Sequence, residues 1–174
     1  MKIVASLTKI SRSKLILSLL ICNLVVGILL YEFLFYLESE FVENYVLLFG
    51  KLFDSMSVYS WIALMIILFP LLETVIFQYL LLLYLKKISD WIFGSHNWTP
   101  AFILTSLLFS FAHITNFGIN FFGIIQVIVL LFIAFSLSLL SIVEQEKKED
   151  GLPILSVFVL HSSYNFSISI PLFL

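Results

Sequence analysis

Residues 58–85, VYSWIALMIILFPLLETVIFQYLLLLYL, hold one acidic side chain, Glu73, and no basic one within a long apolar run. The run exceeds the roughly 20 residues that a helix needs to cross the hydrocarbon core of a bilayer. A charged side chain near the bilayer centre costs roughly 2.5–3.5 kcal/mol on insertion scales, so it usually has a partner or a function. The stretch therefore predicts a membrane-spanning helix with a candidate functional residue inside it.

The composition of the whole chain agrees with this prediction. Hydrophobic residues make up 61% of the 174 residues, charged residues make up 11%, and the mean hydropathy is +1.13. Because soluble domains are only about 45–50% apolar, the composition predicts an integral membrane protein. The net charge of −2, without a run rich in Lys and Arg, argues against a nucleic-acid partner. The single Cys22 excludes a disulfide within the chain.

The apolar runs predict an all-α fold, a polytopic transmembrane helix bundle of about five membrane spans. The predicted spans are residues 15–36, 58–85, 99–114, 121–142 and 152–174. Between the first two, residues 38–57 place apolar side chains at helical spacing among polar ones, which favours an interfacial helix. We therefore divide the chain into an N-terminal membrane helix with its interfacial segment, residues 1–57, and a core helix bundle, residues 58–174.

Lysine and arginine residues fall on alternate connections between the predicted spans. Four lie in the N-terminal tail, and pairs follow the second and fourth spans at Lys86, Lys87, Lys147 and Lys148. Since cytoplasmic loops of membrane proteins carry the excess of Lys and Arg, we expect the N-terminus to be cytoplasmic. The expected location is the inner (cytoplasmic) membrane of a bacterium.

Two further predicted spans carry strongly polar residues, His113 in one and His161 with Asn165 in the other. At a rise of 1.5 Å per residue, Glu73 lies about 18 Å, His113 about 21 Å and His161 about 14 Å from the cytoplasmic ends of their spans. The i,i+4 spacing puts Phe109 and His113 on one helix face, and His161 and Asn165 on another. A single membrane histidine is typical of an interhelical hydrogen bond, but this combination predicts one site in the bundle core.

These motifs, in this order, resemble the CPBP family of intramembrane proteases, which includes type II CAAX prenyl endopeptidases and bacteriocin-processing or self-immunity proteins. The family pattern is Glu-Glu-x-x-x-Arg, then Phe-x-x-x-His, then His-x-x-x-Asn or Asp, on successive membrane helices. The segments PLLETVIFQ, LLFSFAHI and VLHSSYNF match it through Glu73, Phe109, His113, His161 and Asn165. The resemblance covers about residues 58–166, so it implies that the second domain is the catalytic core.

Two positions depart from the family pattern. Thr74 stands where a second Glu is usual, and Gln78 stands where Arg is usual. The positions are four residues apart on a helix, so a Glu and an Arg there could form an ion pair. Replacing both by neutral hydrogen-bonding residues leaves no charge unpaired. We interpret the change as a compensated variant in which Thr74, Gln78 and Phe109 support the site.

The resemblance implies a hydrolase that carries out intramembrane proteolysis of a membrane-associated peptide or protein, of which prenylated proteins are one option. Glu73 and His113 would deprotonate a water that attacks the scissile carbonyl. His161 and Asn165 would donate hydrogen bonds to the developing oxyanion. No cofactor is expected. A Zn²⁺ ion held by two histidines and a glutamate is the second choice, because the H-E-x-x-H signature is absent.

Two other classes of function stay open on the sequence. A non-catalytic membrane scaffold or bacteriocin-immunity factor of the same fold is favoured by Thr74 and Gln78 and by the small size of the chain. A proton-linked transporter is a third reading, since intramembrane Glu and His also mark proton relays, although five spans without an inverted repeat are few for one. The expected partners are membrane lipid and a membrane-associated peptide or protein; the sequence does not define the oligomeric state.

Overall fold

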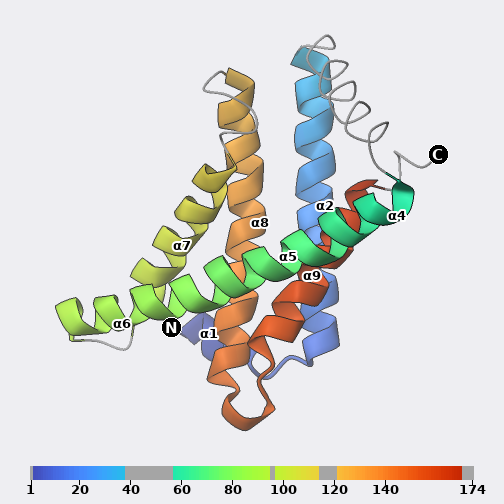
Figure 1. The fold of residues 1–174 in the computed structure, drawn as a ribbon. Helices are drawn as coiled ribbons and strands as arrows, with labels where there is room; N and C mark the ends of the chain where they lie inside the picture. The colour runs from blue at the N-terminus through green and yellow to red at the C-terminus, as the bar shows by residue number, and fades with distance from the viewer. Residues whose placement is uncertain (1, 38–56, 95–96, 114–120, 170–174) are drawn as a thin grey trace.

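The computed structural model describes residues 2–37, 57–94, 97–113 and 121–169. Every regular element in these ranges is a helix, which confirms the all-α helix bundle (Figure 1). Residues 38–56 of the predicted interfacial helix lie outside the described residues, as does the end of the fifth predicted span after residue 169.

The helices follow the order of the predicted spans. They are α1 (Lys2–Leu7), α2 (Arg12–Leu37), a continuous helix of five segments, α7 (Thr99–Ala112), α8 (Phe121–Glu146) and α9 (Pro153–Ser169). The five segments are α4 (Val58–Trp61), η1 (Ile62–Leu68), α5 (Phe69–Glu73), η2 (Thr74–Leu81) and α6 (Leu82–Phe93). A single 3-10 turn, Lys148–Asp150, separates α8 from α9.

The continuous helix alternates between α-helical and π-helical turns. The segments η1 and η2 are π-helical, and α5 lies between them with Pro70 near its start and Glu73 as its last residue. Proline lacks the N–H that would continue the backbone ladder, and π-turns occur frequently at functional sites. The helix ends at Gly94, whose φ of 59° is the left-handed conformation that glycine adopts without strain. Glu73 therefore lies where the backbone geometry of this helix changes.

Among the described residues, three helices are long and apolar enough to cross a membrane, with apolar stretches at Arg12–Leu29, Tyr59–Phe93 and Val127–Glu146. They correspond to the first, second and fourth predicted spans, and the chain is an integral membrane protein. The helices α7 and α9 have 14 and 17 residues, fewer than the roughly 20 of a full span.

The continuous helix extends well beyond the predicted span of residues 58–85. It reaches Phe93 because Lys86 is almost completely buried, forms an ion pair with Asp90 and lies over the ring of Trp98 at 5.2 Å. At 1.5 Å per residue it is about 54 Å long, more than the roughly 30 Å of hydrocarbon in a bilayer. It therefore has to be strongly tilted or leave the hydrocarbon at an end, and Figure 1 shows it crossing α2 and α8 obliquely.

The helix α8 is the centre of the bundle. Half of its apolar stretch is buried, against smaller shares in the other two long helices. It packs against α1, α2, α7, η2 and α9. Its completely buried apolar side chains include Ala134, Leu137 and Leu140, and those of α9 include Val157 and Leu160. All five belong to one hydrophobic core. Large apolar side chains such as Leu29, Leu80 and Phe132 are exposed on the outer faces, as contact with lipid requires.

Candidate active site

The structure brings Glu73 between His113 and His161, which come from three different helices. Glu73 is the last residue of α5, His113 is the C-cap residue of α7, and His161 lies in the middle of α9. Oε1 of Glu73 lies 3.5 Å from Nε2 of His113, and Oε2 lies 3.5 Å from Nε2 of His161. Each carboxylate oxygen thus faces a different imidazole ring.

The imidazole of His113 is held in one orientation by its own helix. Its Nδ1 lies 2.8 Å from the carbonyl oxygen of Phe109. Because a carbonyl oxygen only accepts a hydrogen bond, Nδ1 carries a proton and donates it in this contact. The other nitrogen, Nε2, is then directed toward Glu73. It can accept a proton there or, when protonated, donate one.

The ring of Phe109 forms the apolar wall between the two histidines. Its centroid lies 4.8 Å from that of His113 and 5.9 Å from that of His161. Phe77, on the helix of Glu73, contacts the same ring edge-to-face at 5.5 Å. Since Phe109 is 1% exposed, these contacts fix both imidazoles against a packed surface. The predicted supporting residue therefore touches both histidines.

Burial is uneven across the cluster. The side chains of Glu73 and His113 are 27% and 22% exposed, whereas that of His161 is 5% exposed. Nδ1 of His161 is buried and has no hydrogen-bond partner among the described residues. A molecule that approaches the cluster therefore meets Glu73 and His113 first, with His161 behind them.

Asn165 is placed differently from the other three predicted site residues. Its Nδ2 donates to the carbonyl oxygen of Met65 at 3.0 Å, and Ser162, three residues earlier, donates to the carbonyl of Ile66 at 2.6 Å. Both acceptors lie in the π-helical segment η1, so the two side chains join α9 to the continuous helix. No hydrogen bond between Asn165 and Glu73 is found among the described residues, and the role of Asn165 as an oxyanion donor stays a prediction.

Thr74 and Gln78 are both completely buried. Oε1 of Gln78 accepts a hydrogen bond from Ser138 at 2.6 Å, and its backbone carbonyl accepts one from Ser141, also at 2.6 Å. Oγ1 of Thr74 and Nε2 of Gln78 have no partner within the described residues. Such a site would be costly for a lone charge, which agrees with the joint replacement of the usual Glu and Arg by neutral residues.

The serines of α8 are the polar residues that sequence reasoning did not single out. Ser138 and Ser141 are three residues apart in an otherwise apolar span, a spacing that places both on one helix face. That spacing could have indicated a polar site on α8, but serine is also common where membrane helices simply pack together. Their contacts with Gln78 became visible only in the structure.

In the part of the chain that the structure describes, no group of three or more His, Cys, Asp and Glu side chains converges as a metal ion requires. The absence of a cofactor and the alternative of Zn²⁺ both stay predictions. The arrangement supports acid–base chemistry directly: one carboxylate and two imidazoles, facing each other at an apolar wall, can exchange protons with a bound water.

The fold and the cluster together define the class of helical membrane proteins that bring a glutamate and two histidines from three helices to one place in the bundle. The family model "Type II CAAX prenyl endopeptidase Rce1-like" matches residues 55–167, more than half of the chain. The chain belongs to this family, which confirms the resemblance found in its motifs. The matched region contains Glu73, His113, His161 and Asn165. No curated protein and no solved structure matches the chain.

Proposed function

We propose that this protein is a glutamate-dependent intramembrane endopeptidase that hydrolyses a peptide bond of a membrane-associated peptide or protein. The family is a protease family, and the observation that carries the specific proposal is the position of Glu73 between two Nε2 atoms, at 3.5 Å from each. A direct hydrogen bond is about 2.7–3.2 Å long. The two gaps are slightly longer, so the cluster can open by a small movement to bind a water.

In the proposed reaction, water binds between Glu73 and His113 and loses a proton to the carboxylate. The oxygen attacks the carbonyl carbon of the scissile bond, and a tetrahedral oxyanion forms. The proton then passes to the leaving nitrogen as the C–N bond breaks, which returns Glu73 to its starting state. His113, anchored through Nδ1 to the Phe109 carbonyl, orients the water and shares the proton. Such positioned acid–base catalysis typically contributes about 10²–10⁴-fold.

His161 has a separate role in this scheme. It lies behind the carboxylate, 3.5 Å from Oε2 and almost completely buried. An N–H group in a buried position loses little to competition with water, so it stabilises negative charge more strongly than an exposed donor does. We assign His161 to the support of Glu73 and of the oxyanion, and Asn165 to the oxyanion side once it leaves the Met65 carbonyl.

Cleavage of a membrane-peptide library tests the proposal. Purified wild type is compared with Glu73→Gln, which keeps the shape and most of the hydrogen bonding but accepts no proton. Glu149→Gln, the same chemical change at an exposed residue outside the site, is the matched control. We expect cleavage by wild type and Glu149→Gln and its loss in Glu73→Gln. Prenylated and unprenylated peptides in the library separate the two substrate options.

The proposed site needs no metal, and a chelator separates this from the zinc alternative. We expect cleavage to survive chelation of divalent ions. Activity that is abolished by the chelator and restored by Zn²⁺ would instead make Glu73, His113 and His161 ligands, and Glu73 would no longer be the base.

We further propose a cytoplasmic N-terminus in a bacterial inner membrane, from the Lys and Arg on alternate connections. The exposed Cys22 is first replaced by serine, and a cysteine is then placed at Lys147. We expect this cysteine to react with an impermeant thiol reagent only after the cell is opened. Reaction in intact cells would reverse the orientation.

A second candidate function is a non-catalytic scaffold or bacteriocin-immunity factor of the same fold. The specific observation in its favour is that Asn165 donates to the Met65 carbonyl, which engages a predicted oxyanion donor in helix packing. A biological phenotype that survives Glu73→Gln, together with no detectable proteolysis by the wild type, would decide for this candidate.

A further inference from the structure

A chain of hydrogen-bonded polar side chains runs through the interior of the bundle, outside the Glu73 cluster. Ser106 on α7 donates to Ser138 on α8 at 3.1 Å, and Ser138 donates to Gln78 on η2 at 2.6 Å. Ser141, one turn further along α8, donates to the Gln78 backbone carbonyl at 2.6 Å and accepts from Gln145 at 3.1 Å. We call these five residues the polar column.

The polar column is fully enclosed over most of its length. Gln78, Ser106 and Ser138 have no exposed surface, and Ser141 is 1% exposed. Within the polar column, Nε2 of Gln78 has no partner among the described residues. The same holds for Oγ1 of Thr74, four residues before Gln78, and for Oγ1 of Thr105, the residue before Ser106. Both threonines are completely buried.

Polar atoms that are buried inside the helix bundle without a protein partner usually have a bound water as their partner. Buried polar groups are nearly always hydrogen-bonded to protein or to ordered water. A buried water typically makes about three hydrogen bonds to groups that the protein leaves unsatisfied. Inside a bilayer the lipid provides no substitute partner. One orphaned atom within the polar column, and two on residues that lie next to Glu73 and Ser106 in the sequence, therefore point to bound waters.

The polar column extends from the helix that carries Glu73 to a cavity at one end of the bundle. Toward Glu73, the next buried polar residue on the same helix is Thr74, which lies four residues before Gln78 and directly follows Glu73 in the chain. At the opposite end, Gln145 lines a cavity of about 780 Å³ together with Val4, Thr8, Lys86 and Trp98. This cavity lies at the end of the bundle that carries the Lys-rich connections. A water occupies about 30 Å³ in the liquid, so the cavity can hold many.

We propose that the polar column conducts water from this cavity to Glu73. Hydrolysis consumes one water in each turnover, and a site inside a membrane needs a route that supplies it. The alternative is that the serines only join helices. Helix joining explains the hydrogen bonds between Ser106, Ser138 and Gln78, but it explains neither the three orphaned atoms nor the cavity at the end of the polar column. The consequence for turnover rests on the proposed protease function; the presence of water does not.

Radiolytic hydroxyl labelling in ¹⁸O-water tests the polar column directly, because side chains are labelled by water bound next to them. Leu82 is the reporter: it is completely buried and lies between Gln78 and Lys86 on one helix face. Val157, equally buried on α9, is the reference. We expect label at Leu82 and none at Val157. A Leu82 that stays as unlabelled as Val157 would overturn the proposal.

Two variants link the label to the polar column. Gln78→Met keeps the length of the side chain, and Thr74→Val keeps its shape, but each removes polar atoms that would hold water. We expect each to reduce the label at Leu82 several-fold. Ser136→Ala is the matched control, because Ser136 donates to Asn23 on α2 at 2.7 Å, away from the polar column. A label that both variants leave unchanged would contradict the proposal.

Turnover provides the second readout. Loss of one hydrogen bond to a conducted water should lower kcat about tenfold with KM unchanged, in Gln78→Met and Thr74→Val but not in Ser136→Ala. Label that disappears without any change in kcat would show that the water does not feed Glu73. Because labelling needs no substrate, loss of label in a preparation that cleaves nothing would support the polar column while the protease proposal fails.

Discussion

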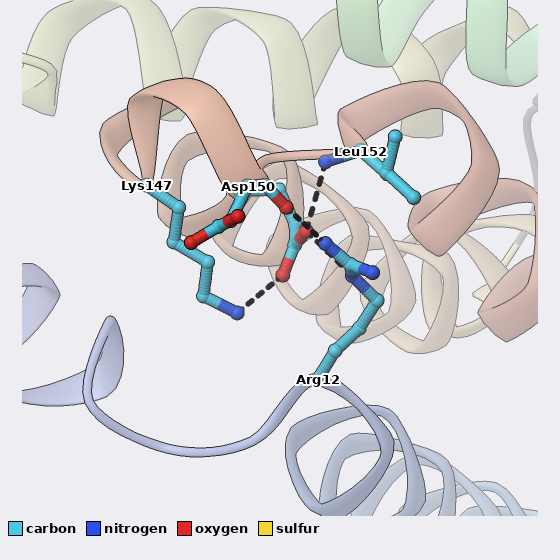
Figure 2. A network of polar contacts seen from close by, with 5 residues as sticks. Arg12, Lys147, Asp150 and Leu152 are labelled. Atoms are coloured by element: carbon cyan, nitrogen blue, oxygen red, sulfur yellow. Dashed lines mark hydrogen bonds and ion pairs between the residues drawn. The ribbon is translucent and has the colours of Figure 1, made fainter.

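Glu73 and Glu144 are both carboxylates inside the helix bundle, but the chain surrounds them in opposite ways. The Glu144 side chain has no exposed surface, and hydrogen-bond donors from three parts of the chain converge on it (Figure 2). Nε of Arg12 lies at 2.8 Å, Nζ of Lys147 at 2.5 Å and the backbone N–H of Leu152 at 3.0 Å. These contacts tie the start of α2 and the start of α9 to the end of α8.

Within the described residues, Glu73 has neither a Lys or Arg partner nor a contact as short as those of Glu144. It faces two imidazoles at 3.5 Å, and a quarter of its side chain is exposed. A buried carboxylate that accepts three hydrogen bonds, two of them from cations, holds structure together. One with free capacity can bind a proton, a water or a substrate. This contrast supports a structural role for Glu144 and our proposal that Glu73 carries the chemistry.

The largest expected effect on stability comes from adding a third acid, at Thr74. Thr74→Glu would place an unpaired carboxylate at a completely buried position, which costs about 3–5 kcal/mol. Adding Gln78→Arg should recover about 0.5–3 kcal/mol, the usual coupling between residues in contact. Unfolding of the two variants in detergent measures both numbers. No recovery in the double variant would contradict the interpretation of Thr74 and Gln78 as a compensated pair.

Glu144→Gln should lower the free energy of unfolding by about 3 kcal/mol, because the amide leaves the charges of Arg12 and Lys147 unbalanced. The lower end of the usual range applies, since the Arg12 side chain is 34% exposed and water screens part of the loss. Glu149→Gln, at an exposed residue, should leave stability unchanged. Equal stability of these two variants would remove the structural role from Glu144.

The smallest expected effect on stability is that of replacing either of two residues of α9, Asn165 or Ser162. Asn165→Ala and Ser162→Ala each remove one hydrogen bond to a carbonyl of η1, which should cost about 1 kcal/mol in each case. If Asn165 also serves the oxyanion, its variant alone should lower cleavage further, by about 10²–10³-fold. Equal activity of the two variants would leave Asn165 with only its helix-joining role.

The main parts of the fold and the proximity of Glu73 to the histidines could be predicted because membranes restrict sequences strongly. Long apolar runs predict membrane helices, and ionisable residues within them are so rare that each one indicates a partner or a function. The similar depths of Glu73, His113 and His161 followed from the rise of a helix alone. The contact of Phe109 with His113 followed from their i,i+4 spacing.

Other features depend on contacts between distant parts of the chain. The fourth span was predicted to end at residue 142, before the charged run, yet α8 continues to Glu146. Near this end Glu144 pairs with Arg12, which lies 132 residues away in the sequence, and no pattern around Glu144 indicates that contact. The engagement of Asn165 with the Met65 carbonyl likewise depends on how α9 packs on η1. The structure also places π-helical turns on both sides of α5. The interfacial helix and the division at residue 57 stay predictions.

A crossed measurement of Glu73→Gln and Glu144→Gln on one cleaved peptide tests the central claim most directly. For each variant, kcat/KM is measured on folded protein and the free energy of unfolding is measured beside it. We predict that Glu73→Gln lowers kcat/KM by about 10²–10⁴-fold with its stability kept, and that Glu144→Gln loses stability while its folded fraction still cleaves. Full cleavage by Glu73→Gln would contradict the assignment of the chemistry to Glu73.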